Sequence, residues 1–249
     1  MIKYGVGLCH YNRLKYLGPM VEAIKNTTPA GTKIVIADDG SEILENTSVG
    51  QVAKETGVVL VQGPNKGVAA NKNRALWALQ DCSMIVLLED DLMPMEPGWF
   101  ELYEKAAMFS GIHHFCRVQD KLVNEAIPVF STFMRQQGLT PIYGPSPRGD
   151  LTFLTNTVVQ TVGAFNPLFR GAGYAHGEWS KRVDKAGLIG HPLKWVDIQE
   201  AQKKFVQIGD REGGRWNNPK SVDKQIKRNR SVLVELNQRD YIFHELVLE

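Results

Sequence analysis

Three consecutive acidic residues, Glu89, Asp90 and Asp91, follow directly after an apolar run over residues 84–88. A short apolar run without a polar break is typical of a central strand covered on both faces, as in a parallel α/β sheet. Carboxylates that end such a strand emerge at the carboxyl edge of the sheet, where open α/β folds bind ligands. Their oxygens suit a hard divalent cation such as Mg²⁺ or Mn²⁺. A strand that simply ends in a solvated acidic turn is the alternative that this motif leaves open.

Two more polar loops follow expected strands earlier in the chain. The run over residues 4–8 leads into Cys9-His10-Tyr11-Asn12-Arg13, and the run over residues 33–37 ends in Asp38-Asp39-Gly40-Ser41. The second loop is typical of a turn, since Asp, Gly and Ser bond locally or tolerate positive φ. In the functional interpretation, one of its carboxylates accepts a hydrogen bond from a nucleotide base or ribose.

A basic segment opens the helix expected over residues 68–80. It contains Asn65-Lys66-Gly67 followed by Asn71-Lys72-Asn73-Arg74. The N-terminal amides of the helix and its basic side chains could receive a diphosphate, although a capped helix with a solvated basic face fits as well. Neither a Walker loop nor a G-x-G-x-x-G motif after a strand is present, which argues against a P-loop NTPase and a typical dinucleotide dehydrogenase.

A glycine-rich segment over residues 171–179 combines Tyr174, His176, Glu178 and Trp179. Glycines let backbone approach a ligand, and the Glu178 carboxylate could serve as a general base. The alternative is a loop whose Tyr and Trp cover the core while Glu178 stabilises a helix N-terminus.

Strand and helix patterns alternate four times in the first 110 residues. Helices are expected over residues 14–27, 49–56, 68–80 and 96–109, and further strands over residues 57–61, 112–118, 150–154 and 194–198, with helices over 156–162 and 180–186. Such alternation predicts βαβ units, a mostly parallel sheet with helices on both faces, and polar loops gathered at one edge.

Composition indicates one folded domain with a basic C-terminal extension. Residues 202–230 hold nine basic and three acidic residues, whereas the whole chain of 249 residues has a net charge of +2. The three cysteines form no C-x-x-C pair, and no apolar run approaches the roughly 18 residues of a membrane span, so a cytoplasmic protein is expected. Glycines around Arg211, Arg215 and Trp216 suit a mobile lid. Residues 220–230 are expected to form a basic helix, which is either a solvated part of the scaffold or a contact for a polyanion.

The order of these motifs resembles that of nucleotide-sugar-dependent glycosyltransferases of the GT-A fold, in the large family-2-like group. The resemblance rests on D-D-G-S, N-K-N-R, E-D-D-L, V-G-A-F-N-P and G-x-G-Y-x-x-G-E-W-S-K-R, over about residues 3 to 190. The E-D-D-L-M-P stretch with the later W-F-E-L-Y also looks like the N-acetylglucosaminyltransferases of that fold.

This resemblance implies a Rossmann-like GT-A domain over residues 1–200, with a nucleotide-sugar half over about 1–110, an acceptor half over 111–200, and a basic lid and helix over 201–249. It implies that Asp91 binds the metal ion with Glu89, and that Glu178 is the catalytic base with Asp184 as a second choice. Two departures bear on the base: the usual Glu-Asp pair is Gly177-Glu178 here, and Asn166 stands where an Asp is common. The implied donor-binding residues are His10, Tyr11, Asn12, Arg13, Asp38, Asp39, Asn65, Lys72, Asn73, Glu89 and Asp90, and the implied acceptor or lid residues are Tyr174, His176, Trp179, Arg211, Arg215 and Trp216.

The implied activity is metal-dependent transfer of a sugar from a nucleotide sugar to an acceptor hydroxyl, with inversion if Glu178 is the base. The sequence leaves open a retaining enzyme, which would need no base at that position. The expected cofactors are Mn²⁺ or Mg²⁺ and a UDP-sugar donor, and the acceptor is a polysaccharide, a glycolipid or a modified DNA base. The alternatives are a non-catalytic nucleic-acid or sugar-nucleotide binding protein on the same fold, and a nucleotide hydrolase or nucleotidyl transferase.

Overall fold

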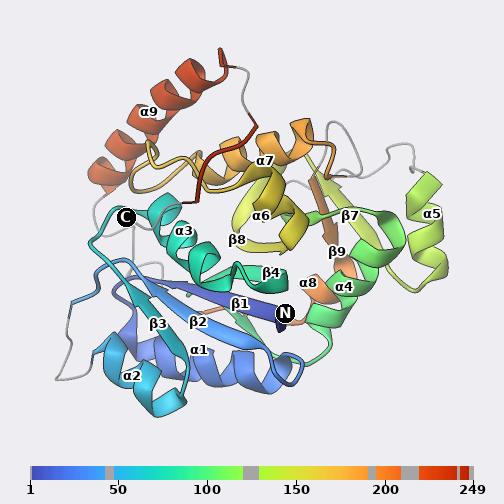
Figure 1. Cartoon of the computed structure of the whole chain (residues 1–249), viewed down its shortest axis with the longest axis horizontal. Coiled ribbons are helices and arrows are strands. Elements are labelled where there is room, and N and C mark those ends of the chain that lie inside the picture. The colour runs from blue at the N-terminus through green and yellow to red at the C-terminus, as the bar shows by residue number, and fades with distance from the viewer. Residues whose placement is uncertain are drawn as a thin grey trace.

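Six strands form the central sheet of the computed structural model, in the order β3-β2-β1-β4-β8-β6 (Figure 1). The structure describes residues 2–42, 48–119, 129–189, 195–208, 219–239 and 242–246. The first four strands in that order are mutually parallel, and β8 runs antiparallel between β4 and β6. The strands are β1 (Ile2–His10), β2 (Lys33–Asp38), β3 (Val59–Gln62), β4 (Cys82–Glu89), β6 (His114–Gln119) and β8 (Ser146–Thr155).

Helices cover both faces of this sheet (Figure 1). One apolar cluster joins the sheet to α1 (Leu14–Thr27), α2 (Val49–Thr56) and α4 (Trp99–Ser110). The other joins it to α3 (Val68–Leu79), α6 (Asn156–Val162) and α7 (Ala175–Lys185). In β4, Val86 and Leu88 belong to the first cluster and Ile85 and Leu87 to the second, because successive side chains of a strand point to opposite faces. Burial on both faces explains the uninterrupted apolar run of this strand.

Short elements complete the chain beyond the sheet. Two small antiparallel ribbons pair β5 with β10 and β7 with β9. The β5–β10 ribbon joins segments more than a hundred residues apart, which no local pattern predicts. The remaining elements are β5 (Leu92–Pro94), α5 (Val129–Gln136), β7 (Pro141–Gly144), β9 (Trp195–Ile198), α8 (Gln199–Gln202), β10 (Phe205–Gln207) and α9 (Pro219–Leu236). Among the helices of the described ranges, none is both long and apolar enough to span a membrane.

The structure adds elements that the sequence did not predict and corrects one expectation. Residues 119–150 have no assigned elements in the sequence-based prediction, whereas the structure places α5, β7 and the first half of β8 there. The segment expected to be a flexible loop up to residue 179 is helical from Ala175, so that His176, Glu178 and Trp179 lie in the first turns of α7. The glycines before Ala175 are typical of a loop, so the sequence pattern did not indicate the start of the helix. In the structure Tyr174, with a left-handed φ of 67°, directly precedes the helix.

The polar loops meet at one edge, as the alternating pattern predicts. His10 pairs with Asp38 and Cys9 with Glu89 in the strand register, so β1, β2 and β4 end side by side. Asn71 at the start of α3 ties these ends together, because its side-chain amide donates to the carbonyls of Ala37 (2.9 Å) and His10 (3.2 Å).

Candidate functional site

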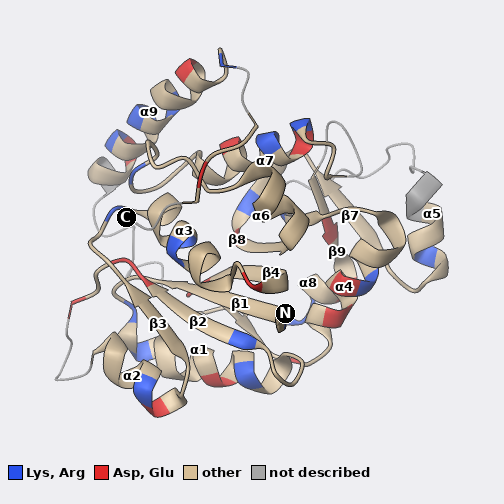
Figure 2. Ribbon diagram, in the orientation of Figure 1, with Lys and Arg blue, Asp and Glu red and all other residues tan. Residues whose placement is uncertain are grey.

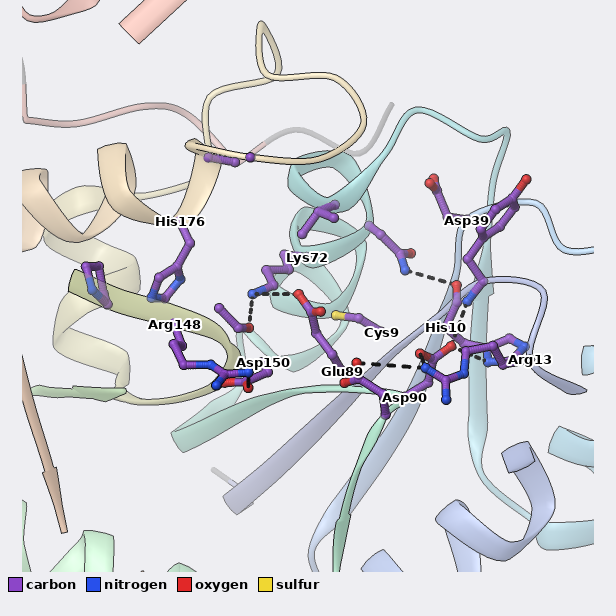
Figure 3. Close-up of a pocket in the computed structure, with 18 of the residues that line it drawn as sticks. Cys9, His10, Arg13, Asp39, Lys72, Glu89, Asp90, Arg148, Asp150 and His176 are labelled. Atoms are coloured by element: carbon purple, nitrogen blue, oxygen red, sulfur yellow. Dashed lines mark hydrogen bonds and ion pairs between the residues drawn. The ribbon is translucent and has the colours of Figure 1, made fainter. Parts of the chain in front are cut away.

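A cavity of about 1110 Å³ opens at the carboxyl ends of β1, β2 and β4. Its floor is the end of β4, and its walls are the β1 loop, the N-terminus of α3, the start of β8 and the first turn of α7. Figure 3 shows His10, Arg13 and Asp90 on one side, Arg148, Asp150 and His176 on the other, and Lys72 beside Glu89 between them. This volume slightly exceeds the roughly 300–1,000 Å³ that is typical of small-molecule pockets.

Asp90 organises the β1 loop that forms one wall. One of its oxygens lies 3.0 Å from Nδ1 of His10 and accepts a hydrogen bond from the backbone N–H of Tyr11 at 3.1 Å. Its other oxygen lies 3.7 Å from the Arg13 guanidinium, which also lies 3.8 Å from a carboxylate oxygen of Asp91. The Asp91 side chain is about a third exposed (32%) and lines the cavity, so it is accessible to a ligand.

Lys72 is a fully buried cation that faces the cavity. Its ammonium donates to the backbone carbonyl of Gly149, lies 3.7 Å from a carboxylate oxygen of Glu89, and sits 5.6 Å above the ring of Phe165. A buried ammonium needs such partners because desolvation is costly. Lys72 therefore compensates the charge of Glu89 at the end of β4.

Asp39 fixes the loop that leads into α3. Its carboxylate accepts from the backbone N–H groups of Lys66 (3.0 Å) and Gly67 (2.7 Å) and from the guanidinium of Arg74 (2.8 Å). Gly67 is required here, because its φ is 96° and a Cβ atom would lie 2.1 Å from the backbone of Gly171. The N-terminus of α3 is thus held against the loop that precedes α7.

The wall opposite the β1 loop contains charged residues that the sequence interpretation missed. Asp150 of β8 lies 2.8 Å from both the Arg117 and the Arg148 guanidinium groups, and both Arg148 and Asp150 line the cavity. Because β8 is antiparallel to β4, its beginning lies at the edge where β4 ends. The run Arg148-Gly149-Asp150 before an apolar strand was a signal in the sequence that could have identified this wall. The sequence did not show the direction of that strand, which decides at which edge these residues lie.

The loop before α7 is held by the C-terminal helix. The Asn229 side-chain amide of α9 is fully buried and donates to the carbonyls of Arg170 (3.1 Å), Ala172 (2.9 Å) and Gly173 (3.1 Å). Gln225 accepts from the Ala172 N–H at 3.1 Å. Gly173 and the half-exposed Tyr174 line the cavity, so α9 supports one of its walls.

Glu178 is not placed to act as a base. It is 5% exposed, lies outside the cavity lining, and forms a two-point ion pair with Arg182 at 2.8 and 3.2 Å. The remaining N–H groups of Arg182 donate to the carbonyls of Val162, Ala164 and Ile242. Asp184, the second choice, also lies on α7 outside the cavity lining. Neither carboxylate lines the cavity, so their expected catalytic role stays a prediction that this arrangement does not support.

Several expected ligand-binding residues contact other parts of the protein. Asp38 is fully buried, and its carboxylate accepts from Ser41 and from Gln62. The Asn73 side chain exchanges two hydrogen bonds with the backbone of Phe165. Trp179 stacks on the Phe165 ring with centroids 4.6 Å apart. Asn12 bonds to the loop after β2, and neither it nor the exposed Asn65 lines the cavity. The expected lid residues Arg211, Arg215 and Trp216 lie outside the described residues.

His176 lines the cavity as an uncharged imidazole. Burial lowers its pKa well below the usual value of 6.5, and the positive charge of Lys72 lowers the pKa further. His114, behind it on β6, has its pKa lowered by burial to about 3. Both rings are therefore neutral at physiological pH.

Comparisons with known proteins identify a common fold. Residues 6–109 match the sequence model of glycosyl transferase family 2. Among solved structures, GalNAc-T7 with UDP, GalNAc and Mn²⁺ aligns with a TM-score of 0.68 at 14% identity, over 94% of this chain and 48% of that one. Glucosyl-3-phosphoglycerate synthase from Mycobacterium tuberculosis, with Mn²⁺, UDP and glucosyl-3-phosphoglycerate, aligns with a TM-score of 0.57 at 13% identity, over 95% of this chain and 79% of that one. The chain thus spans about half the length of GalNAc-T7. No curated protein sequence matches it significantly.

Proposed function

We propose, on the premise that the chain has the GT-A fold and a family-2 glycosyltransferase sequence match over residues 6–109, that it transfers a sugar from a UDP-sugar to an acceptor hydroxyl. The observation that carries the proposal is the pair of carboxylates, Glu89 and Asp91, at the floor of a large cavity with basic side chains beside each. Both structures of similar fold contain UDP and Mn²⁺. In this proposal residues 1–110 bind the donor, residues 111–200 bind the acceptor, and residues 201–249 complete the site.

The residues at the end of β4 fit a divalent cation. Asp91 and Glu89 offer carboxylate oxygens, which are the ligands that Mn²⁺ and Mg²⁺ prefer. Arg13 and Lys72 lie 3.8 and 3.7 Å from these carboxylates, so a bound ion would share the carboxylates with two basic side chains. Asp91 would hold the ion with Glu89, and the bound ion would neutralise charge on the departing diphosphate.

The chain's own residues position the donor around this centre. Arg13 and Lys72 face the space for the diphosphate and can stabilise its negative charge. Tyr11 is 40% exposed at the cavity and offers a ring on which a base can stack. Asp39 fixes the N-terminus of α3, whose first residue Val68 lines the cavity. This end of the helix adds the positive end of a helix dipole.

The wall opposite the β1 loop, formed by Arg148, Asp150 and the first turn of α7, is called the acceptor wall here. Its residues favour transfer with retention of anomeric configuration. An inverting enzyme needs a base on the acceptor side, and Glu178 and Asp184 are turned away from the cavity. His176 is a weak base, because burial and Lys72 hold its pKa well below 6.5. Asp150 forms ion pairs with Arg117 and Arg148, which stabilise its charged form. In this proposal Asp150 accepts a hydrogen bond from the acceptor and orients it. NMR of the glycosidic bond in the transfer product tests this: inversion at C1 contradicts it.

Calorimetric titration with UDP, with and without Mn²⁺, tests the donor site. We expect Mn²⁺-dependent binding that falls at least tenfold, about 1.4 kcal/mol, in Asp91→Asn. The matched control is Asp81→Asn, because Asp81 lies at the opposite end of the same strand, where it pairs with Lys33 on the surface. Equal binding by Asp91→Asn would remove the metal site from these residues.

Failure of every nucleoside diphosphate to bind would refute the glycosyltransferase proposal. A nucleic-acid binding protein would then explain the chain better, since α9 carries the exposed basic residues Lys224, Lys227, Arg228 and Arg230. Figure 2 shows Lys and Arg at several positions along α9. Binding of single-stranded DNA that weakens steeply with salt would support that alternative.

A further inference from the structure

A second group of metal-ligating side chains lies behind the acceptor wall. His114 and Cys116 lie two residues apart on β6, so they project from the same face of the strand, and His176 faces them from the first turn of α7. One ligand atom of each lies within 4.8 Å of the other two. The three side chains are buried, with exposures of 1%, 0% and 9%.

We propose that His114, Cys116 and His176 bind a zinc ion. Two imidazoles and a thiolate are the ligands that Zn²⁺ prefers, whereas the carboxylates at the end of β4 suit a hard cation. The Nδ1 atoms of His114 and His176 are buried without a hydrogen-bond partner, which is costly unless a ligand satisfies them. Ser180 of α7 has its hydroxyl 3.5 and 3.3 Å from the Nε2 atoms of these two rings, so it can orient both imidazoles.

The chemistry of the pocket is compatible with a cation. Cys116 would lose its thiol proton to solvent as the sulfur–zinc bond forms. Lys72 is the cation that faces this group, and the Gly149 carbonyl and Glu89 compensate its charge. Tetrahedral zinc holds its ligand atoms about 3.4 Å apart, given bonds of about 2.1 Å, so atoms at the 4.8 Å limit would move about 1.4 Å closer on binding.

The consequence of such a site is mechanical. It would join β6 to the first turn of α7, whose residues Tyr174, Ala175, His176 and Gly177 line the cavity. The acceptor wall would then be held by the zinc ion from behind and by Asn229 of α9 from the loop side.

Metal analysis of the purified full chain tests the proposal. The protein is incubated with a small excess of Zn²⁺ in Mn²⁺-containing buffer, desalted, and measured by mass spectrometry of the metal. We expect about one zinc per chain, and an X-ray absorption spectrum with one sulfur and otherwise nitrogen or oxygen ligands. Replacement by Co²⁺ should give a thiolate-to-cobalt charge-transfer band.

Variants separate this site from the rest of the chain. Cys116→Ser and His114→Ala should lose the zinc and the charge-transfer band. Cys82→Ser and His113→Gln are the controls, because Cys82 is also a buried thiol and His113 is the neighbour of His114 that bonds to Thr155 instead. Both controls should keep the metal.

The proposal is overturned if wild-type protein retains no zinc, or if its spectrum contains no sulfur ligand. It is also overturned if Asp91→Asn loses the zinc, because the metal then belongs to the cavity floor. The absorption spectrum of wild-type protein decides the question even if the Cys116 and His114 variants fail to fold. Zinc content does not depend on sugar transfer, so this test and that of the proposed function can fail separately.

Discussion

Replacing Glu178 by Gln should destabilise the protein instead of removing a catalytic base. The carboxylate is 5% exposed and binds the Arg182 guanidinium through both oxygens. All five N–H donors of Arg182 are satisfied: two by Glu178 and three by the carbonyls of Val162, Ala164 and Ile242. A Gln side chain removes the carboxylate charge that Arg182 contacts at two points and turns an amide donor toward the guanidinium.

The expected cost follows from burial. Removing one partner of a buried ion pair costs about 3–5 kcal/mol, because the remaining charge is desolvated and uncompensated. For a domain of this size each kcal/mol lowers the melting temperature by about 2–4 °C, so Glu178→Gln should melt roughly 6–20 °C below wild type. Glu235→Gln is the matched control: Glu235 pairs with Arg239 at the same i, i+4 spacing, but both side chains are more than half exposed. Such a surface pair contributes about 1 kcal/mol or less.

Urea and thermal unfolding measure the stability, and calorimetry with UDP and Mn²⁺ measures donor binding on the same samples. Wild-type stability and normal UDP binding in Glu178→Gln, together with loss of sugar transfer, would refute this reasoning. That result would restore Glu178 as the base.

Two other perturbations test the packing around the site. Burial raises the pKa of Asp197 to about 7, while Tyr103 donates to it at 2.6 Å. The folded state therefore holds a proton that the unfolded state releases near pH 4, so the free energy of unfolding should fall as pH rises toward 7. Asp197→Asn should remove about 3 kcal/mol of that loss between about pH 5 and pH 8. Urea unfolding measures this, and an equal dependence of stability on pH in the variant and the wild type would contradict it. Asn229→Leu should cost about 1–3 kcal/mol and weaken UDP binding, because the Gly173 wall loses its support. Asn237→Leu is the control, because Asn237 is exposed just after the end of α9, and it should change neither stability nor UDP binding. Unaltered UDP binding in Asn229→Leu would mean that α9 does not shape the cavity.

The sequence by itself determined the architecture of the donor half. Residues 84–88 are apolar throughout because helices cover both faces of β4, and the helices over residues 14–27, 49–56 and 156–162 have the predicted ends. The placement of the polar loops at one edge followed from parallel βαβ units alone. The GT-A fold and the resemblance to family-2 glycosyltransferases are confirmed, the latter over residues 6–109. These features depend on periodicity and chain order, which a single sequence displays directly.

Only the tertiary structure decided which polar residues face the cavity. Glu178 and His176 lie two residues apart, yet the helix directs one to Arg182 in the interior and the other to the cavity. The antiparallel direction of β8 brings Asp150 to the same edge as Asp91, and no local pattern encodes that direction. His114 and His176 meet across sixty residues because β6 packs beneath α7. Side-chain direction and long-range pairing are set by the packing of the whole core, so they cannot be read from the spacing of residues along the chain.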